Sequence, residues 1–233
     1  MRPTRSTVIG WGAALALLLS GAGGASTDRP EELRFRVMLD EQKIGYHRFR
    51  IQDDGSVRVI EIDADFDVRV LLVPVYSYRH VTTEVWREGC LKSIRAETDA
   101  NGERYTVRGE RRAEAFALST GDGTRRVEDA CLMTFAYWNR DFLAQRRLLN
   151  AQTGQVIDVE VVPLGQTLLA LGTGKVPAEG YRVLAQAEGV DIRVWYALAD
   201  GRWLALESVL ESGRTLRYEP VFGDRLADSG AGA

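Results

Sequence analysis

Two histidines, His47 and His80, are the side chains in this 233-residue sequence that are best suited to act as an acid, a base or a metal ligand near neutral pH. Both lie in stretches where polar and apolar residues alternate, which indicates β-strands. The alternation puts His47 on the same face as Phe49, and His80 on the same face as Tyr78 and Trp86. The two histidines could therefore line one cavity, or each could be a hydrogen-bonded residue of the core.

Established catalytic and nucleotide-binding motifs do not accompany the histidines. The sequence lacks the G-x-S-x-G motif of a serine hydrolase, and Ser77 falls on the strand face opposite His80. The run Gly172–Lys175 lacks the spacing of a phosphate-binding loop. These absences favour a protein that is not an enzyme and needs no cofactor. The alternative is a hydrolase of the cell envelope that pairs His47 or His80 with an acidic residue.

Three aspartates form an acidic row on one face of a predicted strand: Asp63, Asp65 and Asp67. Carboxylates spaced about 7 Å apart could collect a cation. A straight strand, however, does not curl its oxygens around an ion, and such a face more often pairs with Arg or Lys of the neighbouring strand. We therefore predict no metal site here.

The first 25 residues have the order of a secretory signal peptide. Arg2 and Arg5 precede an apolar run over residues 8–19, and small residues follow up to Ala25. The apolar run is shorter than the roughly 20 residues that span a bilayer. We expect cleavage after Ala25, or as second choice after Ala22, and export to the periplasm or another extracytoplasmic space. An uncleaved membrane anchor is the alternative.

The cysteine count agrees with export. Cys90 and Cys131 are the two cysteines, and they do not form a C-x-x-C redox motif. An oxidising compartment favours a disulfide between them, while two separate core thiols are the other possibility.

Composition excludes several classes of protein. The chain is 45% hydrophobic and 27% charged, which is ordinary for a globular protein. Its 30 Lys and Arg are scattered among 33 Asp and Glu, so no basic stripe indicates a nucleic-acid partner. No stretch after residue 25 approaches membrane-spanning length. The oligomeric state stays open at this stage.

Alternation and turn residues predict about ten or eleven strands, joined by tight turns and therefore antiparallel to their neighbours. The predicted strands cover residues 33–39, 45–51, 60–69, 70–87, 90–98, 104–118, 156–163, 181–187, 191–199, 202–210 and 215–222. Residues 164–178 fit neither a strand nor a helix pattern.

Residues 128–150 change period, and we predict one or two short helices there. This patch carries Phe135, Tyr137 and Trp138, which could plug the core or form a lid over an apolar cavity. The residues predicted to line the space beneath it are His47, Phe49, Phe66, Tyr78, His80, Trp86, Phe135, Tyr137 and Trp138.

The predicted fold is mainly β: one curved antiparallel meander, a half-barrel-like sheet, with a short helical insertion. The domain organisation that follows is a signal peptide over residues 1–25, a single β-rich domain over residues 26–223 and a flexible tail over residues 224–233.

Four stretches resemble an uncharacterised family of exported bacterial proteins, the domain-of-unknown-function family numbered 6134. They are RFRVMLDEQKIGYHRFRI, VYSYRHVTTEVWREGCL, CLMTFAYWN with LLNAQTG, and VWYALADGRWLALESVLESGRTLRYE. The resemblance covers about residues 33–222 and supplies no catalytic residues. In architecture, such proteins are similar to periplasmic lipoprotein carriers, whose half-barrel holds acyl chains. The resemblance thus implies a periplasmic protein that binds an apolar ligand, such as an acyl chain, or an envelope partner.

Overall fold

The computed structural model describes residues 30–70, 73–172, 174–210 and 212–221. The predicted signal peptide and the predicted tail lie outside these residues. Within them, no helix is both long enough and apolar enough to cross a membrane. The chain is built from strands: β1 (Glu31–Leu39), β2 (Gln42–Asp53), β3 (Arg58–Val70), β4 (Val73–Arg87), β5 (Cys90–Ala100), β6 (Glu103–Arg112), β7 (Ala115–Thr120), β8 (Gly123–Val127), β9 (Arg147–Leu149), β10 (Val156–Asp158), β11 (Glu160–Leu171), β12 (Gly174–Ala185), β13 (Val190–Ala197), β14 (Trp203–Val209) and β15 (Thr215–Pro220).

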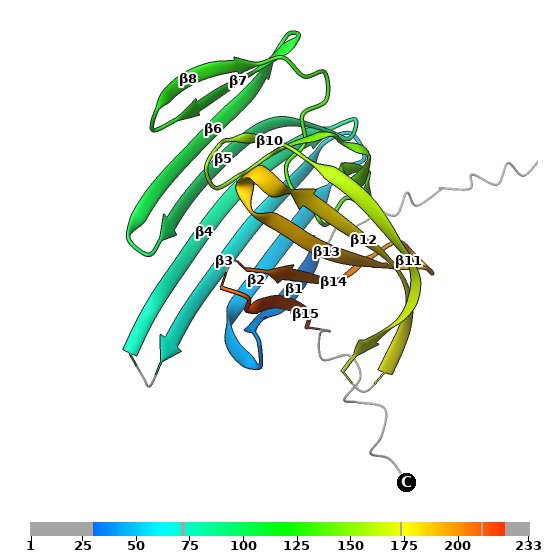
Figure 1. The fold of residues 1–233 in the computed structure, drawn as a ribbon. Coiled ribbons are helices and arrows are strands. Elements are labelled where there is room, and N and C mark those ends of the chain that lie inside the picture. Colours follow the sequence, from blue (N-terminus) through cyan, green and yellow to red (C-terminus); the bar gives the residue numbers. More distant parts are fainter. Residues whose placement is uncertain (1–29, 71–72, 173, 211, 222–233) are drawn as a thin grey trace, which may run out of the picture.

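Thirteen of these strands form one antiparallel sheet that is not closed, in the order β11-β12-β13-β14-β15-β1-β2-β3-β4-β5-β6-β7-β8. Hairpins join neighbours in sequence, and the last strand, β15, pairs with the first, β1, in a register that places Phe35 opposite Pro220. Figure 1 shows the sheet curling, so that β12 and β13 stand across from β3 and β4. The prediction of a mainly β, antiparallel fold is confirmed. The pairing of β1 with β15 joins two series of hairpins, β1 to β8 and β11 to β15, into one sheet.

The inner face of the sheet follows from the period-two pattern of the strands. Alternate residues on β3 are buried, from Ile60 at 0% exposure to Val68 at 6%, and the intervening residues are polar. Phe35 and Val37 on β1 and Phe49 on β2 are buried on the same face. Burial of such large apolar side chains contributes on the order of 2 kcal/mol each, and together they form one core with the irregular segment between β8 and β11.

The predicted helical insertion is wrong. The described residues contain no α-helix, only the short 3₁₀ helices η1 (Arg140–Ala144) and η2 (Gln186–Glu188). Residues 132–134 are all buried, and consecutive burial cannot be satisfied by one face of a helix. Thr134 instead forms a parallel bridge with Leu149, and the Asn139 side chain accepts a hydrogen bond from the Asp141 backbone at the start of η1.

Two further differences concern hairpins. The predicted strand over residues 104–118 is divided into β6 and β7 by a turn at Ala113, a non-glycine residue at φ 50° that carries no turn signature. The ambiguous residues 164–178 belong to β11 and β12. Most of β11 is exposed, including Leu168 at 62%, so burial imposes no alternation on its sequence.

Gly45 should be essential for the pairing of β2 with β3. A Cβ at this position would overlap the backbone carbonyl oxygen of Asp65, so Gly45→Ala requires the strands to move apart. We expect a loss of about 2–3 kcal/mol in the free energy of unfolding, measured by urea denaturation. Gly121→Ala, where a Cβ meets nothing, is the control and should leave stability unchanged. Equal stability of the two variants would contradict this packing argument.

Candidate functional site

The segment of residues 131–152, called the cover segment below, lies against the inner face of the sheet. One end is held to β5 by the Cys90–Cys131 disulfide, which closes a sequence separation of 41 residues. Beside it, the Leu91 backbone N–H donates to the carbonyl of Leu132 at 3.1 Å. In the chain-entropy model a disulfide over a loop of this length contributes about 4 kcal/mol. The structure therefore contains the predicted disulfide, and it holds an irregular segment to a regular strand.

The cover segment is also held by strands on the far side of the curved sheet. The Tyr196 hydroxyl on β13 donates to the carbonyl oxygen of Tyr137 at 2.9 Å. Arg140 forms an ion pair with Glu179 and contacts the Tyr181 hydroxyl, both on β12. The segment thus connects β5 with β12 and β13, two parts of the sheet that are not neighbours in it.

A cavity of about 220 Å³ lies between the cover segment and the sheet. Its walls are mainly aromatic and aliphatic, with a few polar groups among them. The lining residues are His47, Phe49, Ile62, Tyr78, His80, Glu84, Thr134, Phe135, Ala136, Tyr137, Asn150, Ala151, Gln152, Val190, Ile192 and Tyr218.

Strand register brings the two histidines to this cavity. His47 on β2 and His80 on β4 both lie opposite Ala64 of β3, so the three residues form one row across the sheet. The backbones of the histidines are therefore about 10 Å apart.

His80 is fully hydrogen-bonded. Its Nδ1 lies 2.8 Å from the Thr98 hydroxyl and its Nε2 lies 2.7 Å from the Thr82 hydroxyl. Burial lowers the pKa of His80 to about 4, because a charged imidazolium is poorly solvated there. His80 is therefore a neutral residue with both ring nitrogens already satisfied.

His47 is only half satisfied. Its Nδ1 lies 3.2 Å from the Tyr218 hydroxyl, and its ring stacks on Phe49 with 4.3 Å between centroids. Within the described part of the chain, its buried Nε2 has no hydrogen-bond partner. Burial, with a smaller contribution from His80, lowers the pKa of His47 to about 3. The ring is neutral at physiological pH and keeps one polar atom unpaired.

Glu84 is a buried acid that the sequence analysis did not select. It is 1% exposed, and its carboxylate accepts a hydrogen bond from the Trp86 indole at 2.9 Å. A second hydrogen bond connects it to the Thr134 side chain in the cover segment. Burial nevertheless raises the pKa of Glu84 to about 7. The sequence contained a signal for this residue. Glu84 has the same strand parity as His80 and Trp86, which places it on the inner face of the sheet.

The structure brings six of the nine predicted residues to the cavity: His47, Phe49, Tyr78, His80, Phe135 and Tyr137. Phe66 is not part of the lining; it lies beside Tyr78 on the neighbouring strand, with 5.1 Å between the stacked ring centroids. Trp86 and Trp138 pack edge to face at 5.3 Å, away from the cavity. Trp138 instead borders a separate hollow of about 540 Å³, where the Arg58 guanidinium lies 5.3 Å from the centre of its ring. Trp138 therefore anchors the cover segment at a point outside the cavity.

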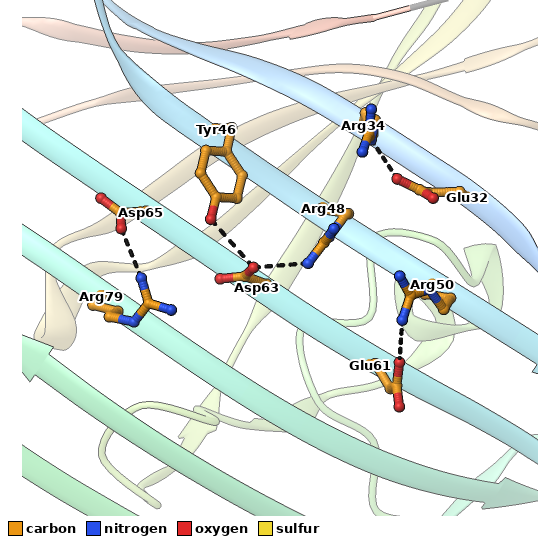
Figure 2. Close-up of polar contacts among 9 residues, drawn as sticks. All are labelled: Glu32, Arg34, Tyr46, Arg48, Arg50, Glu61, Asp63, Asp65 and Arg79. Carbon is orange, nitrogen blue, oxygen red and sulfur yellow. Dashed lines mark hydrogen bonds and ion pairs between the residues drawn. The ribbon is translucent and has the colours of Figure 1, made fainter. Parts of the chain in front are cut away.

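The outer face of the sheet carries ion pairs between neighbouring strands (Figure 2). Asp63 accepts hydrogen bonds from Arg48 at 2.9 Å and from Tyr46 at 3.2 Å, and Asp65 pairs with Arg79 at 2.8 Å. Partly or fully exposed pairs of this kind contribute about 1 kcal/mol or less each. Among the residues that the structure describes, no group of three or more His, Cys, Asp or Glu could hold a metal ion. The acidic row is thus at least partly a solvated, arginine-paired face.

Comparison with known proteins supports the fold and the family resemblance. The family model described as domain of unknown function (DUF6134) matches residues 35–221, most of the chain. No curated protein matches the chain. A solved structure, the crystal structure of a β-barrel-like protein of domain of unknown function DUF1849 from Brucella abortus, is similar with a TM-score of 0.59. That match covers 82% of this chain and 95% of the other at 12% identity, so it shows a shared fold alone.

The pKa of Glu84 predicts a specific pH dependence of stability. Because the folded state raises this pKa from 4.5 to about 7, the folded protein binds the proton more tightly than the unfolded chain. The contribution of Glu84 to the free energy of unfolding therefore decreases as pH rises from about 4.5 to about 7, and it does not change above that range. Glu84→Gln keeps an acceptor for Trp86 but stays neutral. At about pH 8 it should be more stable than the wild type by about 3 kcal/mol, measured by urea unfolding.

The difference between the Gln variant and the wild type should vanish near pH 4.5. His47 and His80 act with the opposite sign, since their lowered pKa values make stability rise with pH from about 3 or 4 up to 6.5. Both proteins share that contribution, so their difference isolates Glu84. A Gln variant that is less stable than the wild type at both pH values would contradict the assignment.

Proposed function

The chain belongs to the DUF6134 family, and we propose that it is an exported protein that holds a small apolar molecule, such as the end of an acyl chain, in the cavity beneath the cover segment. The observation that carries this proposal is the lining of the cavity. Aromatic and aliphatic side chains surround a few convergent polar groups, which is the common composition of small-molecule sites.

The size of the cavity limits the ligand. Its volume of about 220 Å³ is below the range of roughly 300–1,000 Å³ that is typical of drug-sized ligands. A compact molecule, or the terminal part of a longer chain that leaves past the cover segment, fits this volume. Phe135 and Tyr137 line the cavity and are only partly buried, so they are suited to form the entrance.

A hydrolytic function is less well supported. General acid–base catalysis works best with a pKa near the working pH, whereas both histidines have strongly lowered values. Within the described residues, His80 pairs with two threonines and His47 with a tyrosine, and neither pairs with a carboxylate. Glu84 has a pKa near 7, but its hydrogen bonds go to Trp86 and Thr134 and not to a nucleophile with an oriented base.

Filling the cavity should remove binding. Ala151 lines the cavity and is only partly buried, so Ala151→Leu can project its larger side chain into the space without reorganising the core. We expect saturable binding of methyl octanoate or 1-octanol to the wild type and at least about tenfold weaker binding to this variant. Native mass spectrometry detects the complex, and tryptophan fluorescence follows the titration because Trp203 contacts Tyr137 in the cover segment.

Two controls accompany this experiment. Ala170→Leu makes the same change at an exposed position on β11 and should bind like the wild type. Trp138→Ala removes the anchor outside the cavity and should lower stability, by up to about 3–5 kcal/mol, while the folded fraction still binds. Absence of saturable binding to the wild type, or unchanged binding to the Ala151 variant, would reject the proposed site.

Export predicts a processed N-terminus. The charged, apolar and small residues at the start of the sequence and the Cys90–Cys131 bond both suit a secreted protein. N-terminal sequencing of the protein from an extracytoplasmic fraction should begin at Ser26, or less often at Gly23. Recovery of intact Met1 in a soluble cytoplasmic fraction would contradict this prediction.

A further inference from the structure

We propose that the β11 edge of the sheet is a dimer interface, at which β11 pairs in antiparallel fashion with β11 of a second copy of this chain. The interface is independent of the cavity and of the function proposed for it. Three properties of this edge identify the partner: its backbone groups lack a neighbouring strand, its side chains are uncharged, and its sequence can oppose itself.

The strand β11 ends the thirteen-stranded sheet on one side. Among the described residues, no strand pairs with its outer edge. Soluble proteins protect such an edge with charges, proline, bulges or short strands, because its free N–H and C=O groups attract other chains. The first part of β11 has two of these devices, Pro163 and a bulge between Pro163 and Gly165. The remainder, Gln166–Leu171, pairs regularly with β12 and contains no charge, proline or bulge.

The opposite edge of the sheet is protected. Its strand, β8, has five residues, and two of them are arginines. Arg125 donates to the carbonyl oxygen of Gly154 at 2.7 Å, and Arg126 pairs with Glu128 at 3.2 Å. A short, charged edge is a poor partner for an uncharged strand. Contact between two copies therefore joins β11 to β11, which gives a closed two-fold dimer and not a filament.

Two-fold symmetry restricts which residues face each other. In a regular antiparallel pair, residues directly opposite each other lie on the same face of the sheet, so a two-fold axis passes through a residue that opposes its own copy. Leu168 is 62% exposed and is the most exposed large apolar residue in the described part of the chain. Pairing centred on Leu168 brings these two side chains together and removes apolar surface from water in both copies.

Charge is compatible with this register. After its first residue, β11 has no charged side chain, so self-pairing places no like charges opposite each other. On the neighbouring strand β12, Glu179 lies opposite Gln166, and Lys175 lies opposite Ala170. In the proposed register Gln166 of one copy faces Ala170 of the other. Each of these rows therefore ends on Glu179 in one copy and on Lys175 in the other, and like charges do not share a row.

Analytical ultracentrifugation of the purified protein measures the oligomeric state. A single strand pair is a small interface, so we expect a Kd on the order of 10 µM, with a mass close to twice that of the monomer at about 200 µM protein and a monomer at about 1 µM. Amide hydrogen exchange should show protection of alternate residues in Gln166–Leu171 at the higher concentration, and this protection should be lost on dilution.

Charge substitutions at Leu168 test the register. Leu168→Lys and Leu168→Glu each place like charges opposite each other, and each should weaken the dimer at least about tenfold. The side chain is exposed in the monomer, so both variants should fold. An equal mixture of the two variants brings opposite charges together and should restore the dimer. Val81→Lys, which replaces an exposed apolar residue on the central strand β4, is the control and should dimerise like the wild type.

Four results would count against this interface. A wild-type protein that stays monomeric at the higher concentration would overturn it, whether the edge is then free, covered by the chain's own terminal residues or used by a different protein. A dimer that survives unchanged in Leu168→Lys would also overturn it, because the copies would then meet elsewhere. Assembly into larger species that do not close would contradict the two-fold arrangement. Failure of the mixed variants to dimerise would contradict the direct opposition of the two Leu168 side chains.

Discussion

An open sheet with one apolar face must bury that face against something, and this constraint determines the structure. Here the covering element has no regular secondary structure of its own beyond one 3₁₀ turn and a short strand pair. The cover segment cannot be stable by itself, so it is held by a disulfide at β5 and by hydrogen bonds and an ion pair at β12 and β13. The cavity is the space that this irregular cover leaves unfilled.

The strands could be predicted from the sequence wherever burial of one sheet face makes apolar and polar residues alternate. Residues 60–68 alternate strictly, and their inward residues are buried as expected. Residue alternation did not predict segments that are buried on more than one side or segments that are exposed. Residues 132–134 contact neighbours on several sides and were mistaken for a helix, while the exposed β11 gave no pattern. The turn at Ala113 has a left-handed backbone without the Gly or Asn that would announce it.

The site was partly predictable, for a related reason. Strand parity placed His47 and His80 on inward faces, but only the register shows that both oppose Ala64 and share one cavity. Glu84 could have been found from parity alone. Tyr218, in contrast, lies 171 residues from its partner His47 in sequence, and no local pattern connects them. Such a contact depends on the β1–β15 pairing, which is a property of the whole chain.

That pairing has a consequence for biogenesis. Synthesis proceeds from the N-terminus, so the outer edge of β1 stays without its partner until Thr215–Pro220 of β15 have been made. Contacts of such high sequence separation slow folding, and an unpaired apolar edge is prone to aggregation in the meantime. The β1 edge is therefore without its partner strand until nearly the last strand has been made. Truncation at the C-terminus would leave the middle of the sheet open, not its margin.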